Sequence, residues 1–240
     1  KSLLQAKAEG ADIRMVYSPL DALEIARRNP AREVVFFGLG FETTTPSTAL
    51  SIQAAAAEGL ANFSVFCNHI TVPPPIKALL DDPYMRLDGF VGPGHVSMVI
   101  GIHPYDFIAR DYGKPIVVAG FEPLDLLQSV LMVLEQIRDG RAEVENQYAR
   151  VVPEHGNPVS LAAMAYDAEV KFGVVYGAAR RNVPEPEGCA CGAVMTGRIK
   201  PVACPQFGRG CTPEMPLGAL MVSSEGACAA YYQYGGARAE

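Results

Sequence analysis

The sequence predicts an α/β fold, in which parallel sheets are flanked by helices, followed by a small Cys-rich C-terminal region. Runs such as EVVFFGLG (33–40) are apolar without alternation, as in parallel strands buried on both faces. Such runs alternate with stretches of helix-forming composition. Five of the six cysteines lie between residues 189 and 228, where Gly and Pro recur. These observations separate an α/β body from a segment that needs another means of stabilisation.

Six segments have the composition or the end signals of helices. Ser18 is an N-cap followed by Pro19 at the first helical position, and Gly10 follows the first segment as a left-handed cap. The later segments are Ala-rich or amphipathic, and several follow a proline. The predicted helices span 1–9, 18–28, 47–58, 124–139 and 158–169, and residues 72–82 are predicted as an extended proline segment that leads into a helix.

Six shorter runs have the β-branched and aromatic composition of strands. Several of them end in Gly or in a polar turn, as buried parallel strands do. The predicted strands span 13–17, 33–40, 63–69, 87–91, 114–120 and 144–152. We therefore expect α/β lobes over 1–152, a helix and linker over 153–188, and the Cys-rich region over 189–240.

Two Gly-Phe-Glu turns join strands to helices, GFETTTP (40–46) and GFEPLD (120–125). The first places free backbone N–H groups, threonine hydroxyls and the Glu42 carboxylate at the carboxyl edge of a sheet, where open α/β sheets bind ligands. An ordinary tight turn with capping threonines explains the same residues. His95 follows a Gly-Pro-Gly turn, where an imidazole can ligate metal, move protons or cap the next helix.

Composition excludes some functions. The net charge of −6 and the pI near 5.3 argue against a nucleic-acid partner, which normally needs a basic face. No apolar run approaches the roughly 20 residues that span a bilayer, so we expect no membrane association. A body with one cysteine and no signal-like start indicates reduced thiols and a cytoplasmic protein.

Gly and Pro recur in the gaps between the clustered cysteines, so these cysteines lie mostly on turns. The region therefore needs a covalent or metal cross-link to hold its structure. A disulfide framework fits poorly with one cysteine in the first 188 residues. Structural zinc is open, although the one close pair is C-x-C, and inert buried cysteines remain an alternative. An iron–sulfur cluster tolerates long, irregular gaps. The set that fits a cluster is Cys189, Cys204, Cys211 and Cys228, with Cys191 as a spare or as an alternate to Cys189.

The C-terminal run CTPEMPLGALMVSSEGACAAYYQYG (211–235) resembles the signature of the HypD family, whose members mature nickel–iron hydrogenases. Other blocks of that family are similar to segments of this chain in the same order. They are GFETTTPSTA (40–49), VPPPI (72–76), GPGHVSMVIG (92–101) and GFEPLDLLQ (120–128). The resemblance covers nearly the whole chain.

The resemblance implies two Rossmann-like lobes and a C-terminal [4Fe–4S] cluster. It also implies a transient iron carrying cyanide and carbonyl ligands, a HypC-type small chaperone and a HypE-type cyanide donor as partners. The implied function is a scaffold with a redox role that assembles the Fe(CN)2CO group. Carried onto this sequence, the cluster ligands are Cys189, Cys204, Cys211 and Cys228. The residues that match the catalytic cleft motifs are Glu42, Thr43, Thr44 and His95.

Three departures from the family qualify these expectations. The family's Cys-Gly-Gly-His and Cys-Pro-Val-Cys blocks are absent from these 240 residues, so the lobes are incomplete here. A Trp-Arg-Gly stretch expected between the helix after Asn157 and the Cys-rich region is also absent. Leu220 stands where relatives usually have a further cysteine, a change that spares the four matched positions.

Two other functions compete with the maturation scaffold. One is a zinc-stapled α/β hydrolase or transferase, with Glu42 or His95 as the base and the threonine-rich turn as an anion site. The other is a structural reading in which the Cys-rich region is a docking module for another protein. Metal analysis of the purified protein separates the three functions. Bound iron favours the maturation scaffold, bound zinc the hydrolase or transferase, and no metal the docking module.

Overall fold

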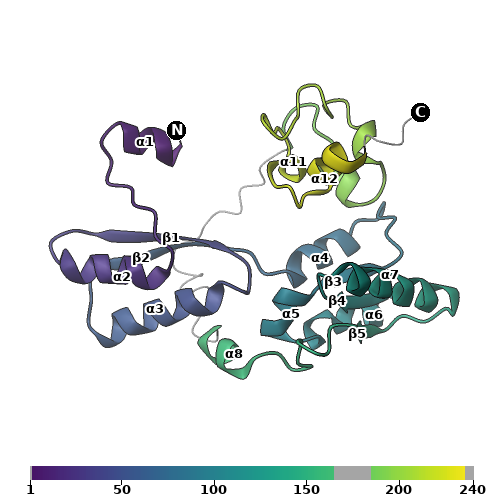
Figure 1. Cartoon of the computed structure of the whole chain (residues 1–240), viewed down its shortest axis with the longest axis horizontal. Coiled ribbons are helices and arrows are strands. Elements are labelled where there is room, and N and C mark those ends of the chain that lie inside the picture. The colour runs from purple at the N-terminus through teal and green to yellow at the C-terminus, as the bar shows by residue number, and fades with distance from the viewer. Residues whose placement is uncertain (1, 165–184, 236–240) are drawn as a thin grey trace. The chain divides into compact units, whose positions relative to one another are not determined.

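The computed structural model describes residues 2–164 and 185–235, shown as a ribbon in Figure 1. The chain divides into two compact units. The first is formed by the described residues of Lys1–Val72, His95–Gly101 and His155–Tyr176. The second is formed by those of Pro73–Gly94, Ile102–Glu154 and Gly177–Glu240.

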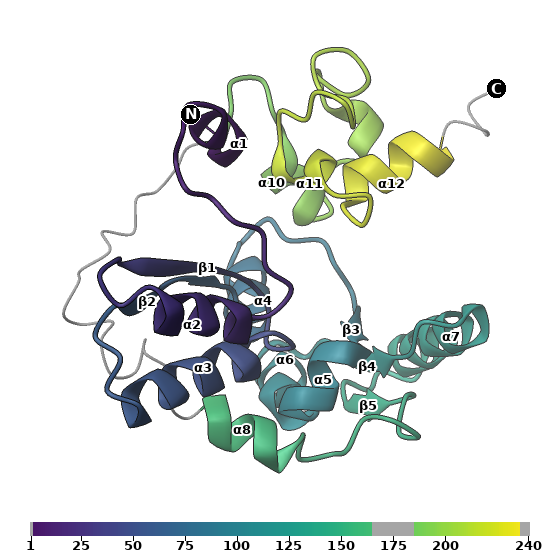
Figure 2. The same ribbon diagram turned by 60° about the vertical axis from the view of Figure 1, so that its left-hand side comes forward.

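The first unit is built on two parallel strands, β1 (Val34–Gly40) and β2 (Phe63–His69), paired along their whole length. One face of this sheet carries α2 (Pro19–Arg28) and α3 (Thr45–Ala57), as Figures 1 and 2 show. The other helices of the unit are α1 (Leu3–Ala8), α5 (Gly94–Ile100), which belongs to it from His95 on, and α8 (Pro158–Met164), which packs on α3.

The helix α2 shows why this unit folds as it does. Ser18 and Asp21 form a reciprocal capping box at its start, and Pro19 occupies the first helical position. Its buried side chains include Leu23 and Ala26, so the apolar stripe of the helix faces the sheet. The first unit thus has a conventional helix-on-sheet core on one face of β1.

The second unit has a three-stranded parallel sheet in the order β3 (Phe90–Pro93), β4 (Ile116–Ala119), β5 (Val144–Asn146). Each residue of the central strand β4 is buried. The long helix α7 (Pro123–Arg138) packs on β3 and β4. The remaining elements are α4 (Pro73–Leu80), η1 (His103–Tyr105), α6 (Asp106–Tyr112), α10 (Cys191–Met195), η2 (Pro201–Ala203), α11 (Ala219–Val222) and α12 (Ala227–Tyr234).

The turn between β3 and α5 requires glycine at position 94. A Cβ there would lie 2.3 Å from the Ala119 carbonyl oxygen at the end of β4. The backbone at the end of β3 therefore approaches β4 more closely than a side chain permits. This approach fixes the start of the helix that carries His95.

The predicted α/β class with parallel sheets is confirmed, and three predicted elements need correction. Residues 13–17 do not form a strand, because no strand pairs with them in the described part of the chain. The strand predicted over 144–152 ends at Asn146, since the Gln147 and Tyr148 N–H groups both bond to the Val118 carbonyl and turn the chain away. The strand predicted over 87–91 begins only at Phe90.

Helices were also missed or shortened. The Gly-Pro-Gly sequence predicts a turn, but α5 begins at its last glycine. Of the helix predicted over 158–169, the structure describes Pro158–Met164, and the rest lies outside the described residues. Over the described ranges, no helix combines the length and apolarity needed to cross a membrane.

Candidate metal centre

The five C-terminal cysteines converge although short elements and turns carry them. Cys191 begins α10, Cys228 is the second residue of α12, and the other three lie outside helices. All five line one small cavity of about 10 Å3, whose other walls are apolar. The cysteines that the sequence analysis singled out thus lie around a single cavity. The cysteines lining the cavity are Cys189, Cys191, Cys204, Cys211 and Cys228.

Two of these sulfurs also form the hydrophobic core of the region. Cys211 and Cys228 are buried together with Met221 and Ala229. Leu220 packs against this group and extends the core. The two thiols therefore contribute to the packing of this region as well as to its candidate ligand set.

The Cys189 and Cys191 side chains occupy one place in the cavity. Their Sγ atoms lie 3.3 Å apart. A Cβ built on Gly218 would lie 2.4 Å from each of these sulfurs, so the glycine leaves room for both. Either thiol is thereby in position to serve as the ligand at this corner.

The thiols are in a desolvated, mutually repulsive environment. Burial, and after it the hydrogen bond with Cys191, raises the pKa of Cys189 to about 11. Burial also raises the pKa of Cys228, with further contributions from the charges of Cys204 and Cys211. A bound cation would supply the positive charge that these thiolates lack.

Aromatic packing and a backbone bond hold the region in place. The Phe207 ring meets Tyr231 and Tyr232 of α12 edge to face, at centroid distances of 6.2 and 5.9 Å. The Arg86 N–H donates to the Thr196 carbonyl oxygen at 2.9 Å. This bond joins the Cys-rich region to the loop after α4.

The donor set suits an iron–sulfur cluster, with one geometric condition. Thiolates in an apolar surrounding are the usual ligands of such clusters. The cavity of about 10 Å3 is at the lower limit for a single water, so the sulfurs would have to move apart to admit a cluster. Across residues 2–164 and 185–235, no three His, Cys, Asp or Glu side chains form a group arranged to hold a metal ion. All six cysteines are unbridged, which excludes the disulfide framework in this structure.

Glu42 is the most unusual residue of the predicted cleft motifs. Its side chain is 1% exposed, and Oε1 accepts a 2.6 Å hydrogen bond from the Val72 N–H. Its Oε2 atom is buried and has no hydrogen-bond partner within the described residues. A buried carboxylate oxygen without a partner costs free energy unless a donor or a cation reaches it. The Glu42 Oε2 atom is therefore a candidate contact for a bound donor or cation.

The threonines of the same turn behave differently from the prediction of free donors. The N–H groups of Thr44 and Thr45 both bond to the Phe41 carbonyl oxygen, and so do their hydroxyls. These groups therefore close the turn instead of opening toward an anion. Thr43 is exposed on the turn. His95 is exposed at the second residue of α5, in the same unit as Glu42.

The two Gly-Phe-Glu turns are alike in sequence only. Glu122, the counterpart of Glu42, has a side chain that is 80% exposed. The buried carboxylate of the second turn is Asp125, which accepts hydrogen bonds from Arg150 at 2.8 and 2.6 Å and from Gln147 at 2.9 Å. The guanidinium of Arg150 lowers the pKa of Asp125 to about 2. Sequence reasoning missed this ion pair, although the aspartate stood in the GFEPLD motif.

Comparison with known families matches this chain over nearly its whole length. The HypD family, described as the hydrogenase formation hypA family, matches residues 1–166 and 160–235. The two matched stretches overlap over residues 160–166. The match thus includes both the cleft motifs and the Cys-rich region.

Individual relatives agree with this match. The hydrogenase maturation factor HypD of Rhodobacter capsulatus is 76% identical over an alignment of 268 positions, which covers 99% of this chain and 71% of the relative. That of Rhizobium leguminosarum bv. viciae is 50% identical, with 98% and 69% covered. That of Escherichia coli K12 is 49% identical, with 97% and 69% covered. Since this chain has 240 residues, the longer alignment means that the R. capsulatus relative carries internal positions that this chain lacks. The chain belongs to the HypD family of hydrogenase maturation factors.

Proposed function

We propose that the chain is a [4Fe–4S] scaffold protein in the maturation of nickel–iron hydrogenase, where the Fe(CN)2CO group is assembled. The observation that carries this proposal is that five cysteines, far apart in sequence, line one apolar cavity. Four of them would hold the cluster, namely Cys189, Cys204, Cys211 and Cys228, with Cys191 as the alternate to Cys189.

The residues around the sulfurs support this role. When bound, the cluster would supply one-electron chemistry. Val194, Phe207 and Met221 wall the cavity and exclude water from it. The Leu217 N–H donates to the Cys211 sulfur at 3.3 Å, and such hydrogen bonds to sulfur tune reduction potential. The chain's own residues would thus hold the cluster, exclude water from it and tune its reduction potential.

The cleft residues Glu42, Thr43, Thr44 and His95 would handle the iron that is being built into the hydrogenase. The buried, unpartnered oxygen of Glu42 favours a cation or an N–H or O–H donor, because an anion would be repelled there. This supports contact with the iron, or with a donor of a partner protein, rather than with free cyanide. His95 would supply an imidazole for ligation or proton transfer.

The partners would be a HypC-type small chaperone and a HypE-type cyanide donor, as the resemblance implies. Cytoplasmic location is part of the proposal, and the six unbridged thiols support a reducing compartment. The zinc-stapled alternative would use thiols of the same cavity, so metal analysis separates it from the cluster.

Anaerobic purification with metal and sulfide analysis tests the proposal. The expected protein is brown, absorbs near 400 nm, and contains about four irons and four sulfides per chain. Separate Cys204→Ser, Cys211→Ser and Cys228→Ser variants should lose most of this iron. Cys67→Ser is the matched control, because Cys67 is exposed on β2 in the other unit.

Two results would overturn the assignment. One is a colourless protein with one zinc per chain, which supports the zinc-stapled alternative. The other is equal loss of iron in Cys67→Ser and in the three cavity variants. Retention of iron in Cys67→Ser alone ties the metal to the C-terminal cavity.

A further inference from the structure

A buried carboxylate in the second unit is tied to the chain that follows β5. Asp125, in the first turn of α7, is 5% exposed and accepts two hydrogen bonds from the Arg150 guanidinium, at 2.8 and 2.6 Å. The Gln147 amide donates to the same carboxylate at 2.9 Å, and the Gln147 Oε1 atom accepts from the Gly120 N–H at 3.2 Å. The planar fork of an arginine fixes direction as well as distance. This network therefore joins the turn between β4 and α7 to the residues after β5.

The ring of Tyr148 lies between two glycines at the carboxyl end of the same sheet. The Arg150 guanidinium lies over that ring, with its central carbon 4.5 Å from the ring centroid. A Cβ built on Gly94 would lie 2.9 Å from the ring's Cδ1 atom, and a Cβ built on Gly120 would lie 2.7 Å from its Cδ2 atom. Cδ1 and Cδ2 are on opposite edges of the ring, so each edge packs against the backbone of one glycine.

The first of these glycines leads directly to a residue of the proposed site. Gly94 is the first residue of α5, and His95 is the second. Because a glycine has no side chain to limit its backbone conformation, the position of Gly94 depends on the groups that pack against it. Those groups include the Tyr148 ring, and Gly120 supports the other edge of the ring. The ring therefore holds the backbone at the residue before His95.

We infer that Tyr148 is a positioning residue for His95, and that the Asp125–Arg150 pair holds the Tyr148 ring in place. The inference rests on the proposed function, in which His95 acts on the iron that is built into the hydrogenase. The aromatic ring makes the contacts described above, and the hydroxyl of Tyr148 does not. Phenylalanine should therefore replace this tyrosine, whereas alanine should not.

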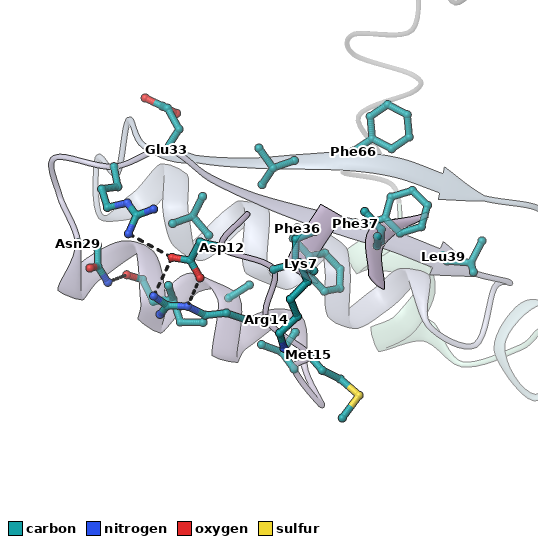
Figure 3. Close-up of a pocket in the computed structure, with 18 of the residues that line it drawn as sticks. Lys7, Asp12, Arg14, Met15, Asn29, Glu33, Phe36, Phe37, Leu39 and Phe66 are labelled. Atoms are coloured by element: carbon teal, nitrogen blue, oxygen red, sulfur yellow. Dashed lines mark hydrogen bonds and ion pairs between the residues drawn. The ribbon is translucent and has the colours of Figure 1, made fainter. Parts of the chain in front are cut away.

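A second bidentate ion pair in the chain shows what burial adds. Arg14 donates to Asp12 at 2.8 and 2.9 Å, as the dashed lines of Figure 3 show. Its two side chains are 49% and 38% exposed, so water screens the pair. Asp125 is buried, and removing its guanidinium partner would leave an uncompensated charge. The Asp125–Arg150 pair is therefore suited to hold a fixed geometry, and the Asp12–Arg14 pair supplies a control.

Proton NMR of the imidazole groups tests the inference in this chain. Arg150→Lys keeps the positive charge and the Tyr148 ring but loses the planar fork, so the Cε1–H resonance of His95 should move. Tyr148→Phe should leave this resonance in place. The His95 resonance is identified by its loss in His95→Gln, and the resonances of His69 and His103 are internal references.

Arg14→Lys is the matched control. It changes a bidentate pair that is exposed and that lies in the other unit, so the imidazole resonances should all stay in place. Because the Tyr148 ring is retained in Arg150→Lys, a moved His95 resonance reports a displacement and not the loss of the ring's own magnetic shielding.

Hydrogenase maturation gives a second readout, in a full-length family member that carries the same residues. Tyr148→Ala and Arg150→Lys should each lower maturation at least about tenfold, because small displacements of a reacting group are costly. Tyr148→Phe should restore the level of the unsubstituted protein. Equal losses in Tyr148→Phe and Tyr148→Ala would assign the effect to the hydroxyl and overturn the inference.

Two NMR results would also overturn it. One is an unmoved His95 resonance in Arg150→Lys, and the other is an equal movement of all the imidazole resonances, which indicates general loosening. If Arg150→Lys does not fold, as judged by circular dichroism, the comparison of Tyr148→Phe with Tyr148→Ala decides. Failure of the proposed function is distinguishable, since His95→Gln would then keep full maturation while Arg150→Lys still moved the His95 resonance.

Discussion

The Sγ atoms of Cys189 and Cys191 lie 3.3 Å apart at one corner of the C-terminal cavity. Two thiols at one corner give the site a reserve ligand. We predict that Cys191→Ser keeps its iron, that Cys189→Ser keeps part of it, and that the double variant keeps none. Iron and sulfide per chain after anaerobic purification measure this. Full iron in Cys189→Ser with none in Cys191→Ser would show that Cys191 is the ligand.

Gly218 is predicted to be indispensable for the same corner. In Gly218→Ala the new methyl group would lie 2.4 Å from both sulfurs, so one or both must move, at a cost of about 1–3 kcal/mol. Lower iron content and a lower melting temperature are expected. Gly192→Ala is the matched control, because its methyl group would meet only the flexible end of Glu185. Equal iron in both variants would contradict this account of the cavity.

Glu42→Gln separates the structural role of this residue from its proposed function. Glutamine can still accept the hydrogen bond from the Val72 N–H, so the melting temperature should change little. Its amide group replaces an oxygen that is available to a cation or donor, so hydrogenase maturation should fall by at least about tenfold. Complementation of a strain that lacks its own HypD, with a full-length family member carrying the change, measures this. Unchanged maturation would remove Glu42 from the cleft chemistry.

Asp125 is predicted to contribute to acid sensitivity. Its pKa is lowered to about 2 by Arg150, so its stabilising effect is fully present above its ordinary pKa near 3.8. That effect is lost as the pH falls from about 4 through 2. Asp125→Asn should therefore flatten the dependence of unfolding free energy on pH in this window. Asp88→Asn, whose carboxylate is 81% exposed, is the control and should keep the wild-type slope. Parallel slopes for wild type and Asp125→Asn would contradict the prediction.

Local signals in the sequence predicted much of the fold. The strand at Phe63–His69 was predicted to the residue, because its composition and its flanking turns act locally. The strand expected at 13–17 failed for a non-local reason, since a strand exists only where another backbone edge pairs with it. The sequence reports the propensity of that segment and not whether a second backbone edge lies beside it.

In the candidate site, too, the sequence predicted the features that depend on residue type and missed those that depend on the folded structure. The four cysteines and Glu42 stood out through residue type and motif, and the fold brings the cysteines to one cavity. The burial of Glu42 against the exposure of Glu122 could not be predicted, because both occupy the same Gly-Phe-Glu pattern. The need for glycine at 218 depends on where two sulfurs lie after folding, which no local pattern encodes.

Because Cys211 and Cys228 are both candidate ligands and half of a four-residue core, air would damage two properties of this region at once. Oxidation of either sulfur to its acid forms would place polar, charged oxygens among Met221 and Ala229. A protein sample that has lost its cluster colour in air would then also have lost the packing of this region. Adding iron alone would not restore the colour. Handling under nitrogen preserves the tertiary structure of the last fifty residues as much as their redox state.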